Sequence, residues 1–260
     1  MTTLTLFSQP LLLFGASLLT GALNGVAGGG SFISFPALLF AGLTPINANA
    51  TNNTVTLVGY LASIRAYRHE LLIHRQQYWV LIGVSVIGGA IGSLLLLHTP
   101  QTLFTKLVPY LLLIATALFA LNPLIATWFQ IHRPISSKYS PLTMLVFGLL
   151  QFTIATYGGF FGGGSGILML ATFSIMGMKN VHAMNALKTT LNACINSVAM
   201  LAFMVAGAIA WQYAILMSCG SLLGGYWGVY YVRRIEPKLV RSFIILIGLS
   251  MTVYFFIKTD

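Results

Sequence analysis

The sequence predicts an all-α polytopic integral membrane protein, in which about ten transmembrane or re-entrant helices form two inverted five-segment repeats with glycine-interrupted helices. Three observations predict this fold class: a scarcity of charge, a series of apolar runs, and a match between the two halves of the chain. Of the 260 residues, 57% are hydrophobic and 6% are charged. A soluble domain carries about 25% charged residues, and a chain of this length keeps much of its surface exposed. Lipid is therefore expected to cover that surface.

The net charge of +10 comes mostly from basic residues in short connections between apolar runs. This distribution is typical of loops that face the cytoplasm and anionic lipid. Nucleic acid is not an expected partner, because no basic stripe is interleaved with aromatic residues. Disorder is excluded as well, since it needs low hydrophobicity and high charge. The lipid bilayer is the expected partner.

Ten apolar runs follow one another along the chain, at 11–27, 31–43, 46–64, 78–97, 103–121, 141–157, 165–178, 181–208, 211–230 and 239–257. Several reach the roughly 20 residues that a helix needs to cross the hydrocarbon. The runs 31–43 and 165–178 are short, and a glycine cluster precedes each. Backbone breaks at membrane depth only where protein or a water-filled cavity surrounds it, so we expect a site at these breaks. Segments 11–43 and 141–178 either cross the membrane fully or form re-entrant hairpins.

The two halves of the chain match in order. The tetrapeptide Gly-Gly-Gly-Ser at 28–31 recurs at 162–165. Further glycines match in pairs: Gly88 with Gly224, Gly89 with Gly225, and Gly92 with Gly228. Because glycine is common in membrane helices, the matched order is the stronger evidence, and we read these three pairs mainly as packing positions. The match predicts a first membrane repeat at 1–121, a cytoplasmic linker at 122–140 and a second membrane repeat at 141–260.

Basic residues predict that the repeats insert upside down relative to each other. The connection at 65–75 carries three Arg residues and its counterpart at 207–210 carries none, whereas 231–241 carries four basic residues and 98–102 none. Positive loops face the cytoplasm, so both termini are expected outside the cell inner (plasma) membrane. Inverted repeats with interrupted helices are typical of secondary transporters, whose sites lie near the midplane.

Four stretches and one proline carry a family resemblance: 24–31 (Asn-Gly-Val-Ala-Gly-Gly-Gly-Ser) with Pro36, 47–52 (Asn-Ala-Asn-Ala-Thr-Asn), 158–166 and 186–189. With them the sequence resembles the TauE/SafE sulfite exporter family, also called the 4-toluene sulfonate uptake permease family. The resemblance covers nearly the whole chain. It implies a transporter that moves sulfite, an organosulfonate such as sulfoacetate, or another small sulfur-containing anion across the bacterial inner membrane.

The acidic residues also favour an anion. Glu70, Glu236 and Asp260 fall in loops or at the end of the chain, so no apolar run contains a carboxylate. Cation carriers and carboxylate proton relays usually need one there. Coupling through backbone carbonyls stays open, because sodium sites can use them.

Lys188 is the one basic residue well inside an apolar run, and it shares a helical face with Asn185, Thr189 and Asn192. An ammonium at membrane depth costs about 3 kcal/mol or more. We expect Lys188 to be the counter-charge of a bound anion, with its three neighbours in the same substrate site. The alternative is that Lys188 snorkels to the interface beside Lys179.

An unusually polar cluster opens the third run after Pro45. Asparagine and threonine offer hydrogen-bond donors without charge, so Asn49, Asn52 and Asn53 are expected to face the substrate. The alternative is interhelical hydrogen bonding that packs the bundle.

The two glycine clusters are expected to open helices whose free N–H groups bind anions. The substrate-binding residues predicted there are Gly29, Gly30 and Ser31 in the first half and Gly163, Gly164 and Ser165 in the second. Two such ends approaching from opposite sides would form a symmetric anion site. Alternatively, the glycines permit close packing or a tight hairpin tip.

Other chemistry has little support in the sequence. No Ser/His/Asp set, phosphate loop or zinc spacing is present, so we predict no enzyme activity, no cofactor and no metal site. A passive anion channel is the main alternative function, and a membrane-embedded enzyme that uses Cys194 or His182 is a weaker one. Direction, coupling ion and oligomeric state stay open, with a homodimer among the possibilities.

Overall fold

The computed structural model describes residues 3–68, 76–130, 141–178, 180–232 and 237–259. Within these ranges all regular structure is helical, which confirms the all-α expectation, and each of the ten apolar runs is largely helical, with the run 211–230 divided among α9, η1 and α10. The helices are α1 (Thr3–Val26), α2 (Ser31–Phe40), α3 (Pro45–Ala66), α4 (Gln76–His98), α5 (Gln101–Gln130), α6 (Pro141–Phe160), α7 (Ser165–Ile175), α8 (Val181–Val205), α9 (Trp211–Leu223), a π-helical turn η1 (Gly224–Gly228), α10 (Val229–Val232) and α11 (Pro237–Thr259).

The chain changes direction at two glycine turns. Between α1 and α2, Gly28 has φ 86°, and between α6 and α7, Gly162 and Gly164 have φ 80° and 83°. Residues with a Cβ rarely adopt this left-handed conformation, whereas glycine adopts it at no steric cost. These turns give the chain two short helices, α2 and α7, each folded back from the longer helix before it.

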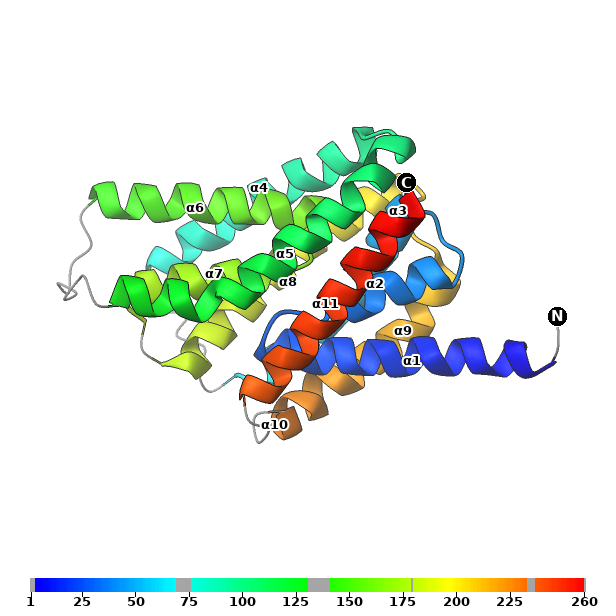
Figure 1. Ribbon diagram of the computed structural model, residues 1–260. Helices are drawn as coiled ribbons and strands as arrows, with labels where there is room; N and C mark the ends of the chain where they lie inside the picture. Colours follow the sequence, from blue (N-terminus) through cyan, green and yellow to red (C-terminus); the bar gives the residue numbers. More distant parts are fainter. Residues whose placement is uncertain (1–2, 69–75, 131–140, 179, 233–236, 260) are drawn as a thin grey trace.

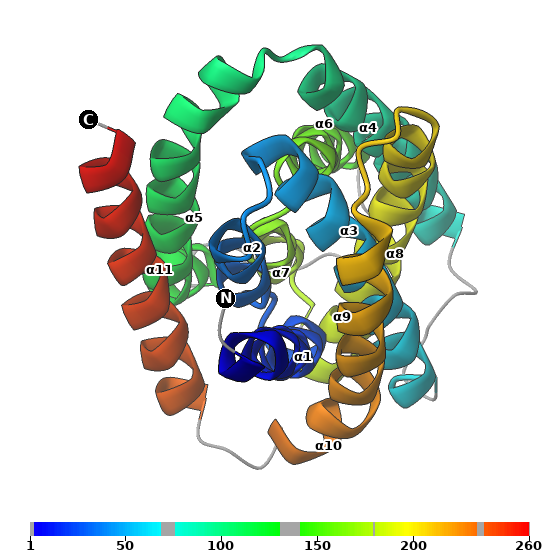
Figure 2. The same ribbon diagram turned by 90° about the vertical axis from the view of Figure 1, so that its right-hand side faces the viewer.

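Helices from both halves of the chain are interleaved. α1 and α6 extend in opposite directions and end near the middle of the bundle (Figure 1). Viewed from the end, α2 and α7 lie at the centre, with α5 and α11 on one side and α8 and α9 on the other (Figure 2). α1 packs on α9, α4 packs on α6, and the two most polar helices, α3 and α8, pack on each other.

The matched glycines lie at the closest helix crossings. A Cβ added to Gly92 in α4 would lie 2.0 Å from the carbonyl oxygen of Thr156 in α6. A Cβ added to Gly224 would lie 1.9 Å from the carbonyl oxygen of Leu18 in α1. Glycine is therefore required for the backbones to come this close, which confirms the expected packing role of these positions.

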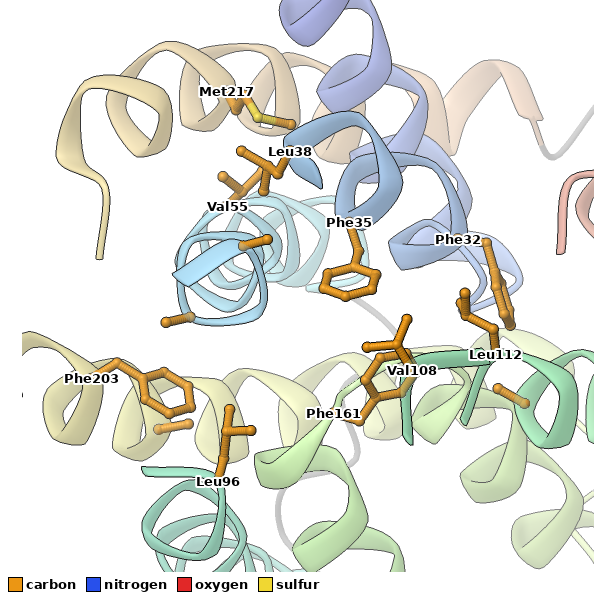
Figure 3. Close-up of a cluster of buried hydrophobic side chains, with 14 of the residues drawn as sticks. Phe32, Phe35, Leu38, Val55, Leu96, Val108, Leu112, Phe161, Phe203 and Met217 are labelled. Carbon is orange, nitrogen blue, oxygen red and sulfur yellow. The ribbon is translucent and has the colours of Figure 1, made fainter. Parts of the chain in front are cut away.

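An aromatic and aliphatic cluster joins the start of α2 to the second half of the chain (Figure 3). Phe32 and Phe35 of α2 are each 1% exposed and pack with Val108 and Leu112 of α5. The ring of Phe35 meets that of Phe161 edge-on, with centroids 5.5 Å apart. This packing holds α2 against the turn between α6 and α7.

Four described helices are long and apolar enough to cross a membrane, namely those containing Gln9–Val26, Tyr78–His98, Gln101–Leu121 and Val181–Val205. Their outward faces are apolar, as at Leu11 and Leu12, which are 72% and 71% exposed. By contrast, the polar side chains of α3 at Asn49, Thr51 and Asn52 are buried. The bundle therefore buries polar side chains beside its apolar core and exposes apolar side chains outward, as a lipid environment favours.

The stretch expected to be a linker, 122–140, is helical in its first part. α5 continues to Gln130, although Asn122 and Pro123 are poor helix formers. Residues 131–140 lie outside the described ranges.

A pair of substitutions in α4 tests the glycine packing. Gly92→Ala is expected to lower the free energy of unfolding by about 1–3 kcal/mol, because α6 must move away from the added methyl group. Gly83→Ala is the matched control: nothing lies within 4 Å of its added Cβ, so the variant should be as stable as the native chain or more stable. Thermal unfolding of the detergent-solubilised proteins measures both, and equal midpoints would contradict the packing assignment.

Candidate functional site

The two glycine turns touch each other. A Cβ built on Gly28 would lie 3.3 Å from the Cα of Gly166, and one built on Gly166 would lie 3.3 Å from the Cα of Gly28. The same added Cβ on Gly166 would lie 3.2 Å from Cδ of Lys188 in α8. Two helix breaks and the one lysine of α8 therefore meet at a single place in the bundle.

Lys188 is fully buried, with 0% exposure. Its Nζ donates to the carbonyl oxygens of Asn24 (3.0 Å) and Gly25 (3.3 Å), and to Oδ1 of Asn185 (2.8 Å). An ammonium has three donors, so each has an acceptor in this conformation. Lys188 therefore points into the bundle and does not snorkel to its surface.

The two carbonyls belong to the last turn of α1. The last four carbonyls of a helix have no partner within it, and together they carry about half a negative charge. Here Tyr67, at the end of α3, also donates to the carbonyl of Gly25 at 3.1 Å. The end of α1 is thus held by α8 through a charge and by α3 through a hydroxyl group.

Asn24 links the end of α1 to the start of α2. Its Oδ1 accepts a hydrogen bond from the backbone N–H of Gly30 at 2.8 Å, while its backbone carbonyl binds Lys188. Its Nδ2 is buried and has no hydrogen-bond partner. Asn24 was not among the predicted site residues, although its position just before a glycine cluster could have singled it out.

The start of α7 is tied to α8 by side chains. Ser165 Oγ donates to Asn192 Oδ1 at 2.9 Å, and Asn192 Nδ2 donates to the backbone carbonyl of Lys188 at 3.0 Å. Thr189 bonds within its own helix, to the carbonyl of Asn185. Among the second-half predictions, Ser165, Asn185, Lys188 and Asn192 therefore form one connected group.

The predicted asparagines of α3 have three separate partners. Asn49 Nδ2 donates to the carbonyl of Phe160, the last residue of α6, at 2.9 Å. Asn52 accepts a hydrogen bond from Ser34 of α2. Asn53 donates to Asn196 of α8 at 3.0 Å. All three make contacts between helices, and Ser34 and Asn196 were not predicted.

The glycines at both breaks are closely packed. A Cβ on Gly29 would lie 2.8 Å from Ile244 of α11, and one on Gly30 would lie 2.3 Å from the carbonyl of Thr20. Gly163 and Gly164 lie in the second turn, where Gly163 accepts a hydrogen bond from the hydroxyl of Tyr157 at 2.7 Å.

Neither α2 nor α7 has a side chain that caps the backbone N–H groups at its start. Their N-cap residues are Gly30 and Gly164, and neither helix has a side-chain cap hydrogen bond. The start of α8 differs, because Asn180 accepts from the backbone N–H groups of His182 and Ala183. Ser31, the first residue of α2, is 8% exposed.

The described parts of the chain contain no group of three or more His, Cys, Asp or Glu side chains that could hold a metal ion. Cys194 and Cys219 are free thiols. The three acidic residues of the chain, like Lys179, lie outside the described ranges. Within those ranges, Lys188 therefore has no carboxylate beside it.

Comparison with known proteins gives one family and several relatives. A family model described as "Sulfite exporter TauE/SafE" matches residues 13–255. The chain is 28% identical to "Probable membrane transporter protein" of Haemophilus influenzae, covering 93% of this chain and 92% of the relative. It is 27% identical to "Probable membrane transporter protein ORF9" of Sinorhizobium sp. (93% and 90%) and 26% identical to "Probable membrane transporter protein YfcA" of Escherichia coli K12 (94% and 89%). No solved structure matches the chain.

The hydrogen bond from Lys188 to Asn185 can be tested by a double-mutant cycle. Asn185→Ala removes an acceptor from a buried ammonium, so it should lower the free energy of unfolding by about 2 kcal/mol. In a Lys188→Met background the same change should cost much less, because no ammonium is left to satisfy. Thermal unfolding of the four proteins measures the coupling. An equal loss in both backgrounds would mean that Asn185 supports α8 independently of Lys188.

Proposed function

Because the chain belongs to the TauE/SafE sulfite exporter family of membrane transporters, we propose that it carries a small oxyanion, sulfite or an organosulfonate such as sulfoacetate. The observation that carries this proposal is Lys188, a fully buried ammonium at the meeting point of two helix breaks. Its present acceptors are two neutral carbonyls and one neutral amide. A buried ion is stable when it is paired, so this position suits an anion.

The neighbouring helix starts support an anion over a cation. The backbone N–H groups at a helix start carry about half a positive charge and bind anionic groups. α2 and α7 both start beside Lys188 without a side-chain cap, so their partial charges add to that of the ammonium. A cation placed here would meet the full positive charge of the ammonium, which the roughly half negative charge at the end of α1 offsets only in part.

Matched contacts support two repeats, at 1–121 and 141–260, of opposite orientation. Gly88 lies against the carbonyl of Phe152, and its counterpart Gly224 lies against that of Leu18; Leu18 and Phe152 are themselves 134 positions apart. The equivalent helices α5 and α11 pack antiparallel, since Tyr110 contacts Phe256 while Thr116 lies against Gly248. Antiparallel packing of equivalent helices is what an inverted repeat produces.

The same repeat suggests how access alternates. The end of α1 is held by Lys188 of the other half, and the end of α6 is held by Asn49 of the other half. If the halves rock against each other, each motion releases one helix end and keeps the other. In this scheme an anion that takes the ammonium from the carbonyls of α1 favours the release of that end.

The arrangement in the membrane follows from the basic loops. We place the chain in the inner membrane, with both termini outside and residues 122–140 in the cytoplasm. We assign no enzymatic activity to it.

Flux of sulfite and sulfoacetate into proteoliposomes tests the proposed function. Native protein should give saturable flux, and Lys188→Ala should reduce it at least tenfold, because the counter-charge is lost. Lys106→Ala is the matched control: it removes the same charge from an exposed position of α5 and should leave the flux unchanged.

Two outcomes would contradict the proposal. Absence of flux for every sulfur anion tested would exclude the substrate class. Flux without saturation and without counterflow would identify a passive anion channel.

The orientation has its own test. A variant without Cys194 and Cys219 receives a single cysteine by Ser136→Cys, in the predicted cytoplasmic linker. In intact cells a membrane-impermeant thiol reagent should label it only after the membrane is permeabilised. Labelling of intact cells to the same extent would reverse the orientation.

A further inference from the structure

The side chain of Asn24 has one polar atom that nothing satisfies. Asn24 is 1% exposed, and its Nδ2 is buried without a hydrogen-bond partner. A buried donor left unpaired costs about 1–3 kcal/mol, so it is expected to have a partner in some state of the protein. Its carboxamide is anchored at the start of α2, because Oδ1 accepts from Gly30 N–H. Nδ2, on the same carboxamide group, therefore also lies at that helix start.

The positions equivalent to Asn24 and Lys188 in the other half of the chain carry neither a free amide donor of this kind nor a charge. With the repeat offset of 134 the counterpart of Asn24 is Gly158, which has no side chain. With the offset of 136 that matches Asn49 to Asn185, the counterpart of Lys188 is Asn52, a neutral amide that already accepts from Ser34. At the start of α7, the hydroxyl of Ser165 is likewise occupied, by Gly162 and Asn192.

We infer that the oxyanion binds at one break only, at the start of α2, with Asn24 Nδ2 and Lys188 Nζ as its two side-chain ligands. This inference rests on the proposed function and replaces the symmetric site expected from the sequence. Asn24 is then a binding residue that determines which anions are accepted.

The chemistry of the two ligands defines the substrate class. An ammonium and an amide N–H both donate hydrogen bonds, and the start of α2 adds a positive partial charge. A sulfite or sulfonate group has several oxygens that accept, so one can bind Asn24 while another binds Lys188. A halide offers a single centre and satisfies this pair less well. The site should therefore favour oxyanions over chloride.

Binding must also displace a contact. Lys188 now donates to the carbonyls of Asn24 and Gly25, whose negative ends would repel an anion at the same place. An anion that pairs with Lys188 therefore draws the ammonium away from the end of α1. Anion binding is thereby coupled to the release of the end of α1, which is part of the proposed rocking motion.

The first test replaces the unpaired donor alone. Asn24→Asp keeps the oxygen that accepts from Gly30 but exchanges the nitrogen for a negatively charged oxygen. Stability should be kept or raised, because the new carboxylate pairs with Lys188, yet sulfoacetate flux should fall at least tenfold. Gln101→Glu is the matched control, since Gln101 Nε2 is also buried and unpaired but opens α5; its flux should equal that of the native protein.

The outcomes separate the two proposals. Normal sulfoacetate flux with an unchanged KM in Asn24→Asp overturns the role of Asn24 and leaves the transporter assignment standing. Absence of flux in the native protein overturns both. Equal loss of flux in Gln101→Glu shows a general effect of a buried acid and overturns the assignment to Asn24.

A second experiment does not depend on how Asn24→Asp folds. In a background without Cys194 and Cys219, Asn24→Cys and Gly158→Cys place a thiol at each of the two equivalent positions. The space at Gly158 allows this, because its added Cβ meets nothing closer than 3.4 Å. Sulfoacetate should slow the labelling of Asn24→Cys by a sulfonate-bearing thiol reagent at least fivefold and leave that of Gly158→Cys unchanged. Equal protection of both would overturn the one-sided site.

Discussion

The structure depends on one electrostatic requirement: α1 ends inside the bundle, and its last carbonyl groups need hydrogen-bond donors there. The last carbonyls of α1 lie away from lipid and water, and an unpaired buried carbonyl costs free energy comparable to that of a lost hydrogen bond. Lys188 meets this need from the other half of the chain, with Tyr67 beside it. Because the ammonium must itself be surrounded by acceptors, α8 has to cross at the end of α1. That crossing brings the two glycine turns together.

The polarity of the remaining helices follows from this arrangement. α3 and α8 carry most of the buried amide side chains, and they pack on each other through the Asn53–Asn196 contact. Helices around them, such as α4 and α5, turn apolar side chains outward. The glycines on α4 let α6 pack closely against it, and the glycines on η1 do the same for α1. Close backbone contact supplies the van der Waals packing that holds helices together where lipid replaces water.

The sequence allowed the helices to be located but left their partners unknown. Apolar runs and glycine clusters mark where helices lie and where they turn, so α2 and α7 were recognisable as short helices. The end of α5 was not located, because the stretch 122–140 has the composition of a linker, whereas α5 continues through Asn122 and Pro123 to Gln130. Two of the three acceptors of Lys188 lie 163 and 164 positions away and are backbone carbonyls, which any residue carries. Asn196 could have been predicted from the sequence, since it lies four residues after Asn192 on the same helical face.

The one-sided site that we propose has a physical reason of its own. A duplicated chain could carry a lysine at both equivalent positions, 52 and 188, and would then bury two like charges in one core. Each would need its own acceptors, and their repulsion is strong at low dielectric constant. Asn52 avoids this cost, because its amide is neutral and its oxygen accepts from the hydroxyl of Ser34. The single lysine leaves one positive charge in the core, with which an anion in the proposed site would pair. In the carrier that we propose, a core formed by two similar halves therefore gains from having its charge in only one of them.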